Sequence, residues 1–266
     1  MASHSQNKTV PALRVCFNSL SDYFNNNHAD TYNGFRDLLS YLLIEKTNHQ
    51  CVYSKLFNRT PNGIEINNFT SFVINKCQII ALGEENISFL ISCVFEIRKK
   101  LADHFKMPNL SFSSNTMNMG ISRSVKSHPE YYVAKSAIIK TDSTKFKKFI
   151  ALSDAEKLLD TKRFIEHRLK VQADAFGITL PDNLNVTVLK LGTIKPIAFK
   201  TLKNGRPLWY TSVDIIFSCQ LHIVGPWYLS TLASKGNGHV SFCKSPGTMT
   251  AETESFINQL ESWVED

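Results

Sequence analysis

Residues 31–46, TYNGFRDLLSYLLIEK, decide the fold because they hold the clearest helix signal near the start of the chain. Apolar residues recur there at spacings of three and four, which is one face of a helix with 3.6 residues per turn: Phe35, Leu38, Leu39, Leu42 and Leu43. Asp30 or Thr31 can cap this helix. The preceding segment, 10–20, is rich in Val, Leu and Phe and predicts a strand.

Working outward, the rest of the first half predicts strand, strand, helix, strand. Residues 51–57 form a short apolar segment, and 69–82 follow the turn at 61–63, so both are predicted as strands. A second helix carries an apolar face at Ile87, Leu90, Ile91, Val94 and Leu101 and has cations at 98–100. A strand over 108–121 completes the order βαββαβ, the ferredoxin-like pattern.

The second half repeats this order. It predicts a strand at 131–141, a long basic helix at 154–176 and a strand at 186–200 broken at Gly192. Asn204-Gly205 is a hairpin signal leading into 209–224. A short helix at 226–233 and a strand at 239–243 follow. We therefore predict an α+β fold of two tandem ferredoxin-like modules, 10–125 and 126–246, with an amphipathic C-terminal helix at 247–266 that packs on the body or docks on a partner.

Composition excludes several classes of protein. Of the 266 residues, 43% are hydrophobic and 20% charged, which is typical of a folded domain and not of a disordered chain. No apolar run reaches the roughly 18 residues of a membrane span, and the start lacks a signal-peptide core, so we expect a cytoplasmic protein with no membrane partner. The six cysteines are scattered, which predicts buried thiols and neither a metal site nor a disulfide framework. No cofactor is expected.

Positive charge is concentrated in the middle of the chain. Residues 123–206 hold 17 Lys and Arg against 8 Asp and Glu, whereas 207–266 hold 2 against 6. One dense basic stretch is what a protein that binds a phosphate backbone shows. A lysine-rich solvated surface is the alternative, and charge alone does not separate the two.

Few motifs point to a particular chemistry. The chain has no phosphate-binding loop, zinc-protease motif or nucleophile elbow. It has a short loop at 235–239, KGNGH, whose glycines would let a backbone approach an anion closely. An ordinary tight turn is the alternative reading of this loop.

Three features together resemble the CRISPR-associated endoribonucleases of the RAMP superfamily, which cut precursor CRISPR RNA. They are the tandem plan, the segment CVYSKLF at 51–57 after the first helix, and the run from Cys219 to Gly238 in which a strand, a short helix and a glycine-rich loop follow one another. The aromatic-glycine pair that usually ends this loop in the family is absent after Gly238, and the tail helix is additional. The resemblance covers about residues 10–245.

The resemblance implies cleavage of RNA without a metal, by attack of the ribose 2′-oxygen on the adjacent phosphate. Such chemistry needs a proton-transfer group, for which histidine is suited. His49, just beyond the first helix, holds the position of the family's catalytic histidine, and His28 is the second choice. Lys55 would stabilise the phosphorane and Tyr32 would position the phosphate, whereas Tyr41 is better explained by packing.

RNA binding is expected mainly on the second half. Contacts to a duplex should be made to phosphates, because A-form RNA hides its base edges in a narrow major groove. The candidates are Arg123, Lys126, Lys135, Lys162, Arg163, Arg168, Lys170, Lys203, Arg206 and Lys235, with Gly236 and Gly238 of the loop. Some of these cations are expected to be solvated surface residues.

Two other hypotheses stay open. The chain could be a non-catalytic RNA-binding subunit of the same fold within a CRISPR ribonucleoprotein, joined to other effector subunits. It could also be a phosphoesterase using His239-Val240-Ser241, which matches one half of a paired H-x-[ST] motif, although no partner motif stands upstream. Precursor CRISPR RNA is the partner expected for the endoribonuclease.

Overall fold

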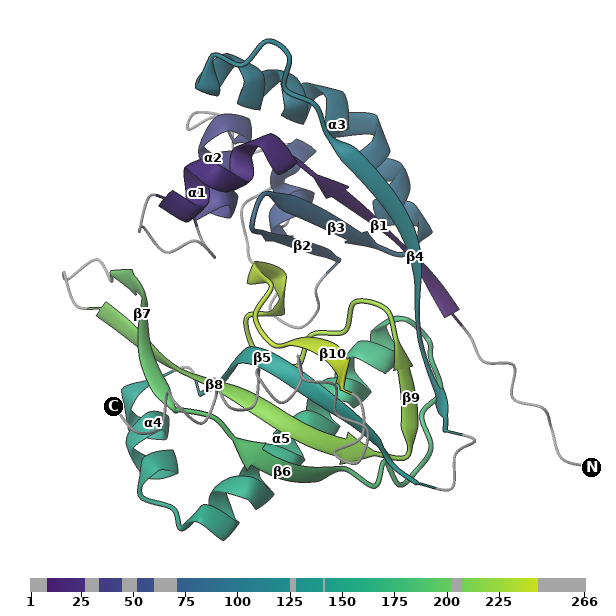
Figure 1. The fold of residues 1–266 in the computed structure, drawn as a ribbon, viewed down its shortest axis with the longest axis vertical. Coiled ribbons are helices and arrows are strands. Elements are labelled where there is room, and N and C mark those ends of the chain that lie inside the picture. The colour runs from purple at the N-terminus through teal and green to yellow at the C-terminus, as the bar shows by residue number, and fades with distance from the viewer. Residues whose placement is uncertain are drawn as a thin grey trace, which may run out of the picture. The chain divides into compact units, whose positions relative to one another are not determined.

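The computed structural model describes residues 9–26, 34–44, 52–59, 71–124, 128–140, 142–201 and 207–243. Within these ranges the chain forms two compact units (Figure 1). The N-terminal unit holds residues 9–119 and 234–236, and the C-terminal unit holds 120–233 and the residues after 236. No helix in the described ranges is long and apolar enough to cross a membrane.

The N-terminal unit keeps the order strand, helix, strand, strand, helix, strand, but its second and third strands are not the segments predicted for them. Its elements are β1 (Thr9–Cys16), η1 (Asn18–Leu20), α1 (Ser21–Asn26), α2 (Gly34–Leu43), η2 (Val52–Phe57), β2 (Phe72–Asn75), β3 (Gln78–Leu82), α3 (Glu84–Phe105) and β4 (Ser113–Arg123). The strands lie in the order β2-β3-β1-β4. Strand β3 lies between β1 and β2 and is antiparallel to both.

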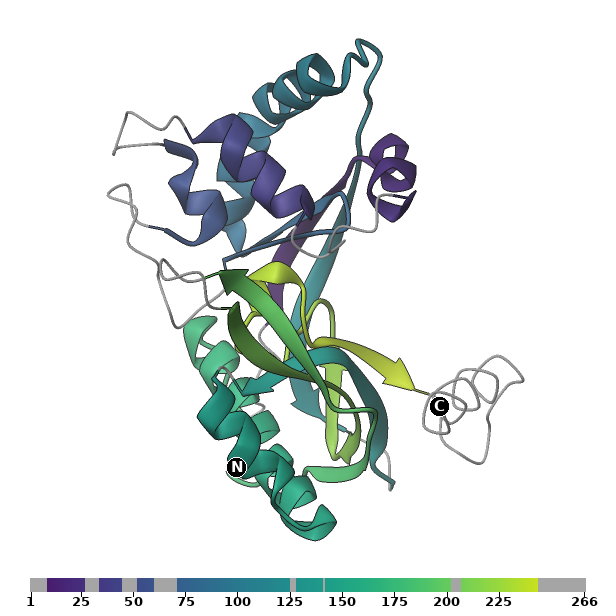
Figure 2. The same cartoon turned by 90° about the vertical axis from the view of Figure 1, so that its left-hand side faces the viewer.

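Helices α2 and α3 cover one face of this sheet (Figure 2). Alternate strand residues point toward the helices, among them Val15, Ile79 and Phe72, and they join Leu39 of α2 and Leu90 of α3 in one buried cluster. The 3.6-residue period predicted both helices, and the structure confirms them at these positions.

Two expectations for this half were wrong. Residues 52–57 form the 3₁₀ helix η2 and not a strand, and Arg36 of α2 holds its end by donating from Nη2 to the Phe57 carbonyl at 2.8 Å. The segment 69–82 is a hairpin of β2 and β3 and not one strand. The turn has positive φ at Lys76 and Cys77, 41° and 60°, a conformation that glycine or asparagine usually signals.

The C-terminal unit contains β5 (Glu130–Lys140), α4 (Ser143–Ile150), α5 (Asp154–Ala175), β6 (Thr187–Leu191), β7 (Lys195–Thr201), β8 (Pro207–Cys219), β9 (Leu221–Val224), η3 (Ala233–Lys235, whose last two residues belong to the N-terminal unit) and β10 (His239–Cys243). Its sheet has the order β10-β5-β8-β6, all antiparallel, with β7 paired to β8. Helices α4 and α5 lie along one face (Figure 2). The end of β4, Gly120 to Arg123, pairs with β9.

The helix expected at 226–233 is absent from the described structure, which is a further correction. Backbone groups of this segment form hydrogen bonds with residues 238–240 instead of with the next turn of a helix. Val240 N donates to the Trp227 carbonyl at 2.8 Å, and Leu229 N donates to the Gly238 carbonyl at 2.7 Å. The Gln172 side chain of α5 donates to the Tyr228 carbonyl and accepts from Tyr228 N. Hydrogen bonds to these distant residues satisfy the backbone groups that a helix would pair locally.

The other predicted elements of this half fare better. Strands at β5, β6 and β10, the break at Gly192 and the long helix α5 are confirmed, and a capping box of Ser153 and Glu156 begins that helix. The 209–224 segment is interrupted after Cys219, giving β8 and β9. The Asn204-Gly205 turn and the tail helix lie outside the described residues. Of the described cysteines, Cys77, Cys93 and Cys219 are buried thiols, as expected, whereas Cys16 and Cys243 are only half-buried.

Candidate nucleic-acid interface

Most of the predicted catalytic residues lie outside the described ranges. These are His49, His28 and Tyr32, and the same holds for three RNA-binding candidates, Lys126, Lys203 and Arg206. Arg123 is the last residue of β4, but its side chain is not described. The roles of all seven residues stay predictions.

Lys55, the described member of the catalytic set, is engaged in an ion pair. Its Nζ lies 2.5 Å from Glu85 Oε1 at the start of α3 and 5.5 Å from the centroid of the Phe89 ring. The hydrogen bond and charge of Lys55 hold the pKa of the Glu85 carboxyl below its ordinary value. Since the Glu85 side chain is 87% exposed, water and salt screen this pair.

The four candidates on α5 do not share one face. Arg163 and Lys170 are seven residues apart on the exposed side, with the exposed His167 between them. Lys162 is half-buried and lies 3.9 Å from Glu166. Arg168 is also half-buried: burial lowers its pKa, and its Nε has no described hydrogen-bond partner. The exposed stripe of α5 therefore offers Arg163 and Lys170 to an anion.

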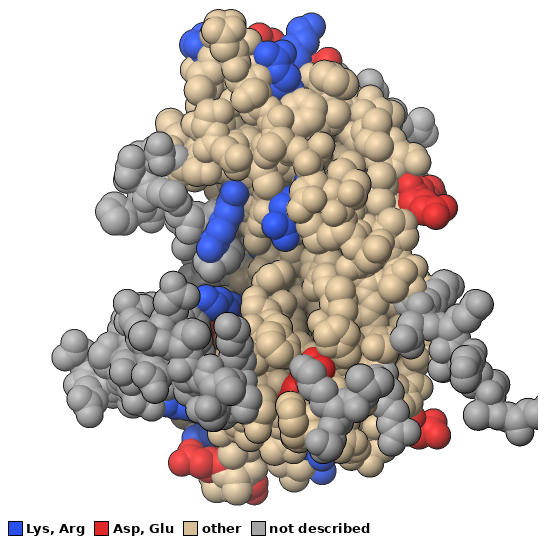
Figure 3. Space-filling view, turned by 45° about the vertical axis from the view of Figure 1, so that its right-hand side comes forward, with Lys and Arg blue, Asp and Glu red and all other residues tan. Residues whose placement is uncertain are grey.

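A shallow open depression of about 490 Å³ lies at the C-terminal end of α5. It is lined by Lys170, Asp174 and residues 177–182, which include Asp182. Two carboxylates against one ammonium make this depression unsuited to phosphate. On the face shown in Figure 3, the lysine and arginine side chains stand apart on a mostly uncharged surface.

The glycine loop is packed against protein. Gly238 has φ +72°, and its N–H donates to the Lys135 carbonyl at 2.7 Å, so this N–H is occupied. A Cβ on Gly238 would lie 2.4 Å from the Leu229 carbonyl oxygen. Gly236 has φ +79°, and a Cβ there would lie 1.7 Å from Asn75 Nδ2. Both positions need glycine for close packing, whether or not the loop contacts RNA.

Two further RNA-binding candidates, Lys135 and Lys235, lie within the described residues. Lys135 is exposed on β5, where the register with β8 shifts between Ala134 and Ala137. Lys235 ends η3 and is half-buried. Contacts of Lys135 and Lys235 with RNA stay predictions.

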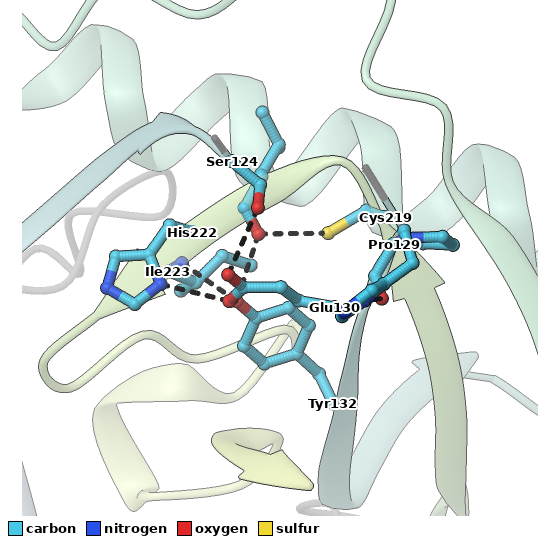
Figure 4. Close-up of polar contacts among 9 residues, drawn as sticks. Ser124, Pro129, Glu130, Tyr132, Cys219, His222 and Ile223 are labelled. Atoms are coloured by element: carbon cyan, nitrogen blue, oxygen red, sulfur yellow. Dashed lines mark hydrogen bonds and ion pairs between the residues drawn. The ribbon is translucent and has the colours of Figure 1, made fainter. Parts of the chain in front are cut away.

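A cluster that sequence reasoning missed lies where β5, β8 and β9 meet (Figure 4). Its centre is the carboxylate of Glu130, the first residue of β5, which is only 3% exposed. Ser124 Oγ lies 3.1 Å from Glu130 Oε1, while Tyr132 OH and His222 Nδ1 lie 2.8 and 2.9 Å from Oε2. A carboxylate that is buried in this way requires such donors, because desolvation of an unpaired charge is costly.

Tyr132 links the cluster to β9. Its hydroxyl also lies 2.9 Å from the Leu221 carbonyl and accepts from Ile223 N at 2.9 Å. Burial raises the pKa of Tyr132 well above its ordinary value, with Glu130 adding to the effect. Burial likewise raises the pKa of Cys219 to about 11. The phenol and thiol are therefore neutral hydrogen-bonding groups beside a single carboxylate.

No sequence motif marks this cluster, since Glu130 and His222 are 92 positions apart. The one available signal is a glutamate at the start of an otherwise apolar strand, which requires a partner when it is buried.

Comparison with known proteins bears on the fold. No family model matches the sequence, and no curated protein matches it. The fold is that of the Cas6 endonucleases that process CRISPR RNA, so the resemblance drawn from the sequence is confirmed at the level of the fold. The tandem ferredoxin-like plan itself is not established by this likeness.

Three solved structures carry this comparison, and each is covered in full by 89% of this chain. A CRISPR RNA processing endoribonuclease Cas6b has a TM-score of 0.57 at 14% sequence identity. A second Cas6b structure has 0.54 at 13%, and Csf5, a type IV CRISPR-Cas Cas6 crRNA endonuclease, has 0.53 at 14%.

Proposed function

We propose that this chain is a metal-independent endoribonuclease that cleaves precursor CRISPR RNA within its repeats. The observation that carries the proposal is the likeness in fold, over 89% of the chain, to structures described as CRISPR RNA endonucleases. The basic middle of the sequence supports RNA as the partner. Other subunits of a CRISPR effector complex and a cytoplasmic location belong to the same proposal.

The proposed reaction balances within the RNA itself. The ribose 2′-oxygen bonds to the adjacent phosphorus and gives its proton to a base, while the bond from phosphorus to the 5′-oxygen breaks and that oxygen takes up a proton. The products are a 2′,3′-cyclic phosphate and a 5′-hydroxyl. His49 is proposed for proton transfer, with His28 as the second choice, and Tyr32 is proposed to position the scissile phosphate.

Lys55 is proposed to stabilise the charge of the phosphorane. Its present partner, Glu85, is exposed, so a bound phosphate can compete for the ammonium. Lys55→Ala should lower the cleavage rate, and Glu85→Gln, which frees the ammonium, should not. Equal rate losses in the two variants would point to a structural role for the pair.

The proposed organisation is two ferredoxin-like modules, 10–125 and 126–246, followed by a tail helix. The C-terminal unit has the strand order β10-β5-β8-β6, and the N-terminal unit has the order β4-β1-β3-β2. If the four strands of each set are numbered along the chain, both sheets have the order fourth, first, third, second. The second helix of the module is replaced by the irregular segment 226–238. We propose that the second module diverged at this segment.

Incubation of the full chain with its repeat RNA in EDTA tests the proposed function. We expect cleavage at one position, a cyclic phosphate detected by mass spectrometry, and no cleavage when the nucleotide before the scissile bond is 2′-deoxy. His49→Ala should abolish cleavage while RNA binding persists. Cleavage that fails in EDTA and appears with magnesium would contradict the mechanism.

A non-catalytic RNA-binding subunit is the second candidate. The observation that favours it is the ion pair that engages Lys55 with Glu85. It predicts tight, salt-sensitive binding with no cleavage, and unchanged binding in the His49→Ala and His28→Ala variants. The same EDTA assay separates the two candidates.

A further inference from the structure

A buried carboxylate fixes one imidazole of the C-terminal unit in a single orientation. His222 Nδ1 lies 2.9 Å from Glu130 Oε2 (Figure 4), and the Glu130 carboxylate also accepts a hydrogen bond from Ser124 Oγ at 3.1 Å. An ionised carboxylate accepts hydrogen bonds and donates none. When Glu130 is ionised, the neutral ring therefore carries its proton on Nδ1, which leaves Nε2 as an acceptor.

The outer edge of this imidazole faces solvent. The His222 side chain is 51% exposed, whereas Glu130 is buried, and no described residue is bonded to Nε2. In β9 the burial alternates, so that Leu221 and Ile223 point inward and His222 points out. A ring that served only to neutralise Glu130 would not need this free acceptor.

The neighbouring strand leaves room for a ligand beside the ring. Ser122 of β4 lies directly opposite His222 in the antiparallel register. Residues opposite each other share a face, and the neighbouring position of β4 on that face is Gly120, while Ser124 follows the end of the strand. All three are small, so they do not cover the imidazole.

The chemistry of the RNA backbone selects what this acceptor can bind. Phosphate oxygens are acceptors and cannot pair with a neutral Nε2. The ribose 2′-hydroxyl is the donor that the backbone carries, and DNA lacks it. Resting on the proposed function, we propose that His222 binds a ribose 2′-hydroxyl through Nε2, with Glu130 as the positioning residue, and so distinguishes RNA from strands without that group.

The test compares two strands that cannot be cleaved. One is the repeat RNA with a single 2′-deoxy nucleotide at the scissile position, and the other is the same sequence with 2′-fluoro throughout, which keeps the A-form but cannot donate. Binding to the full chain is measured at pH 8, where free imidazole is neutral. Single-turnover cleavage of the all-ribose strand is measured beside it.

The main variant is His222→Asn. The asparagine amide retains a donor near the Nδ1 position and removes the outer acceptor. We expect about a 3- to 10-fold loss of affinity for the ribose strand, the range of one neutral hydrogen bond, and no loss for the 2′-fluoro strand. If the contacted ribose is the scissile one, the loss appears in the cleavage rate instead.

Two further variants protect the test against misfolding. His222→Gln places an amide oxygen near Nε2 and loses the bond to Glu130, so it should bind the ribose strand better than His222→Asn while melting at a lower temperature. A purely structural role would reverse the binding order. His104→Asn, the same change at an exposed histidine on α3, should not alter the preference for ribose.

A loss of affinity in His222→Asn that is larger for the ribose strand than for the 2′-fluoro strand supports the inference. An equal loss of affinity for both strands overturns it. Normal affinity for both strands together with wild-type cleavage by His222→Asn also overturns it, while leaving the proposed function intact. If the wild-type protein neither binds nor cleaves the repeat RNA, the proposed function fails first and this inference falls with it.

Discussion

The two units solve the same packing problem with different side chains. In the N-terminal unit, apolar residues of regular period fill the space between a sheet and two helices, as Val15, Leu39 and Leu90 show. Both units also bury polar side chains, such as Arg36 in the N-terminal unit and Gln172 in the C-terminal unit, but among the described residues the buried carboxylate, that of Glu130, belongs to the C-terminal unit. The comparison teaches that irregular backbone, such as 226–238, requires polar side chains to satisfy it.

The largest expected effect concerns glycine in the irregular segment. Gly238→Ala forces alanine to φ +72° and places its Cβ against the Leu229 carbonyl, so unfolding should become easier by about 2–5 kcal/mol in urea titrations. Gly83→Ala in the N-terminal unit shares the positive φ, but its nearest neighbour lies 3.9 Å away, and about 1–3 kcal/mol is expected. Equal costs would show that close packing at Gly238 is unimportant.

The second effect tests the buried amide. Gln172→Leu removes the two hydrogen bonds between the Gln172 amide and the backbone N–H and carbonyl of Tyr228. The free energy of unfolding, measured by chemical denaturation, should fall by about 2–4 kcal/mol. Arg163→Leu, on the exposed side of the same helix, should stay within about 0.5 kcal/mol of wild type. A neutral result at Gln172 would show that its amide is not needed to satisfy the backbone of Tyr228.

The third effect is a loss of stability at alkaline pH. Burial raises the pKa of Cys77 to about 12 and of Cys93 and Cys219 to about 11, above the ordinary 9.0. Unfolded thiols therefore lose protons at a lower pH than folded ones, so stability holds below pH 9 and falls as the pH rises toward 11. The expected loss is on the order of 1 kcal/mol per thiol at pH 10.

Urea titrations of the reduced protein at pH 8, 9 and 10 measure this loss. Cys93→Ala should make the alkaline loss smaller than in wild type, whatever its cost in packing at pH 8, while Cys77 and Cys219 still contribute. Burial also raises the pKa of Tyr132, which should add to the alkaline loss in the C-terminal unit. A steeper fall in the alanine variant than in wild type would refute the assignment.

The smallest effect is a gain in stability. Lys106 ends α3 in the left-handed conformation with φ 55°, so Lys106→Gly should raise the free energy of unfolding by about 0.5–1 kcal/mol. Lys99→Gly, the same change inside the exposed face of that helix, should lower it by about 1 kcal/mol. Thermal melts of the two variants should therefore shift in opposite directions.

Sequence reasoning located elements wherever local period and packing agree. Helices α2 and α3 and strand β10 follow directly from their apolar patterns. It failed where distant partners decide the structure. Residues 52–57 are held as a 3₁₀ helix with the help of Arg36, and 226–233 bond with β10 and Gln172. The β2–β3 turn carries no glycine to reveal it.

The candidate site shows the same division. The cations on α5 could be predicted because charge and helical period are both local properties. The pairing of Glu130 with His222 could not, since it depends on β5 and β9 meeting through the folded sheet. The predicted histidines His49 and His28 are not tested by the described residues.

The chain enters the N-terminal unit twice, which bears on its synthesis. Residues 234–236 return to that unit, where the Ser234 carbonyl accepts from Arg36 Nη1 at 3.3 Å and Gly236 packs on Asn75. A ribosome must therefore make all of residues 120–233 before the N-terminal unit can be completed. A nascent chain stalled before Ser234 should expose the Gly236-facing side of Asn75 to protease or to chaperones until translation resumes.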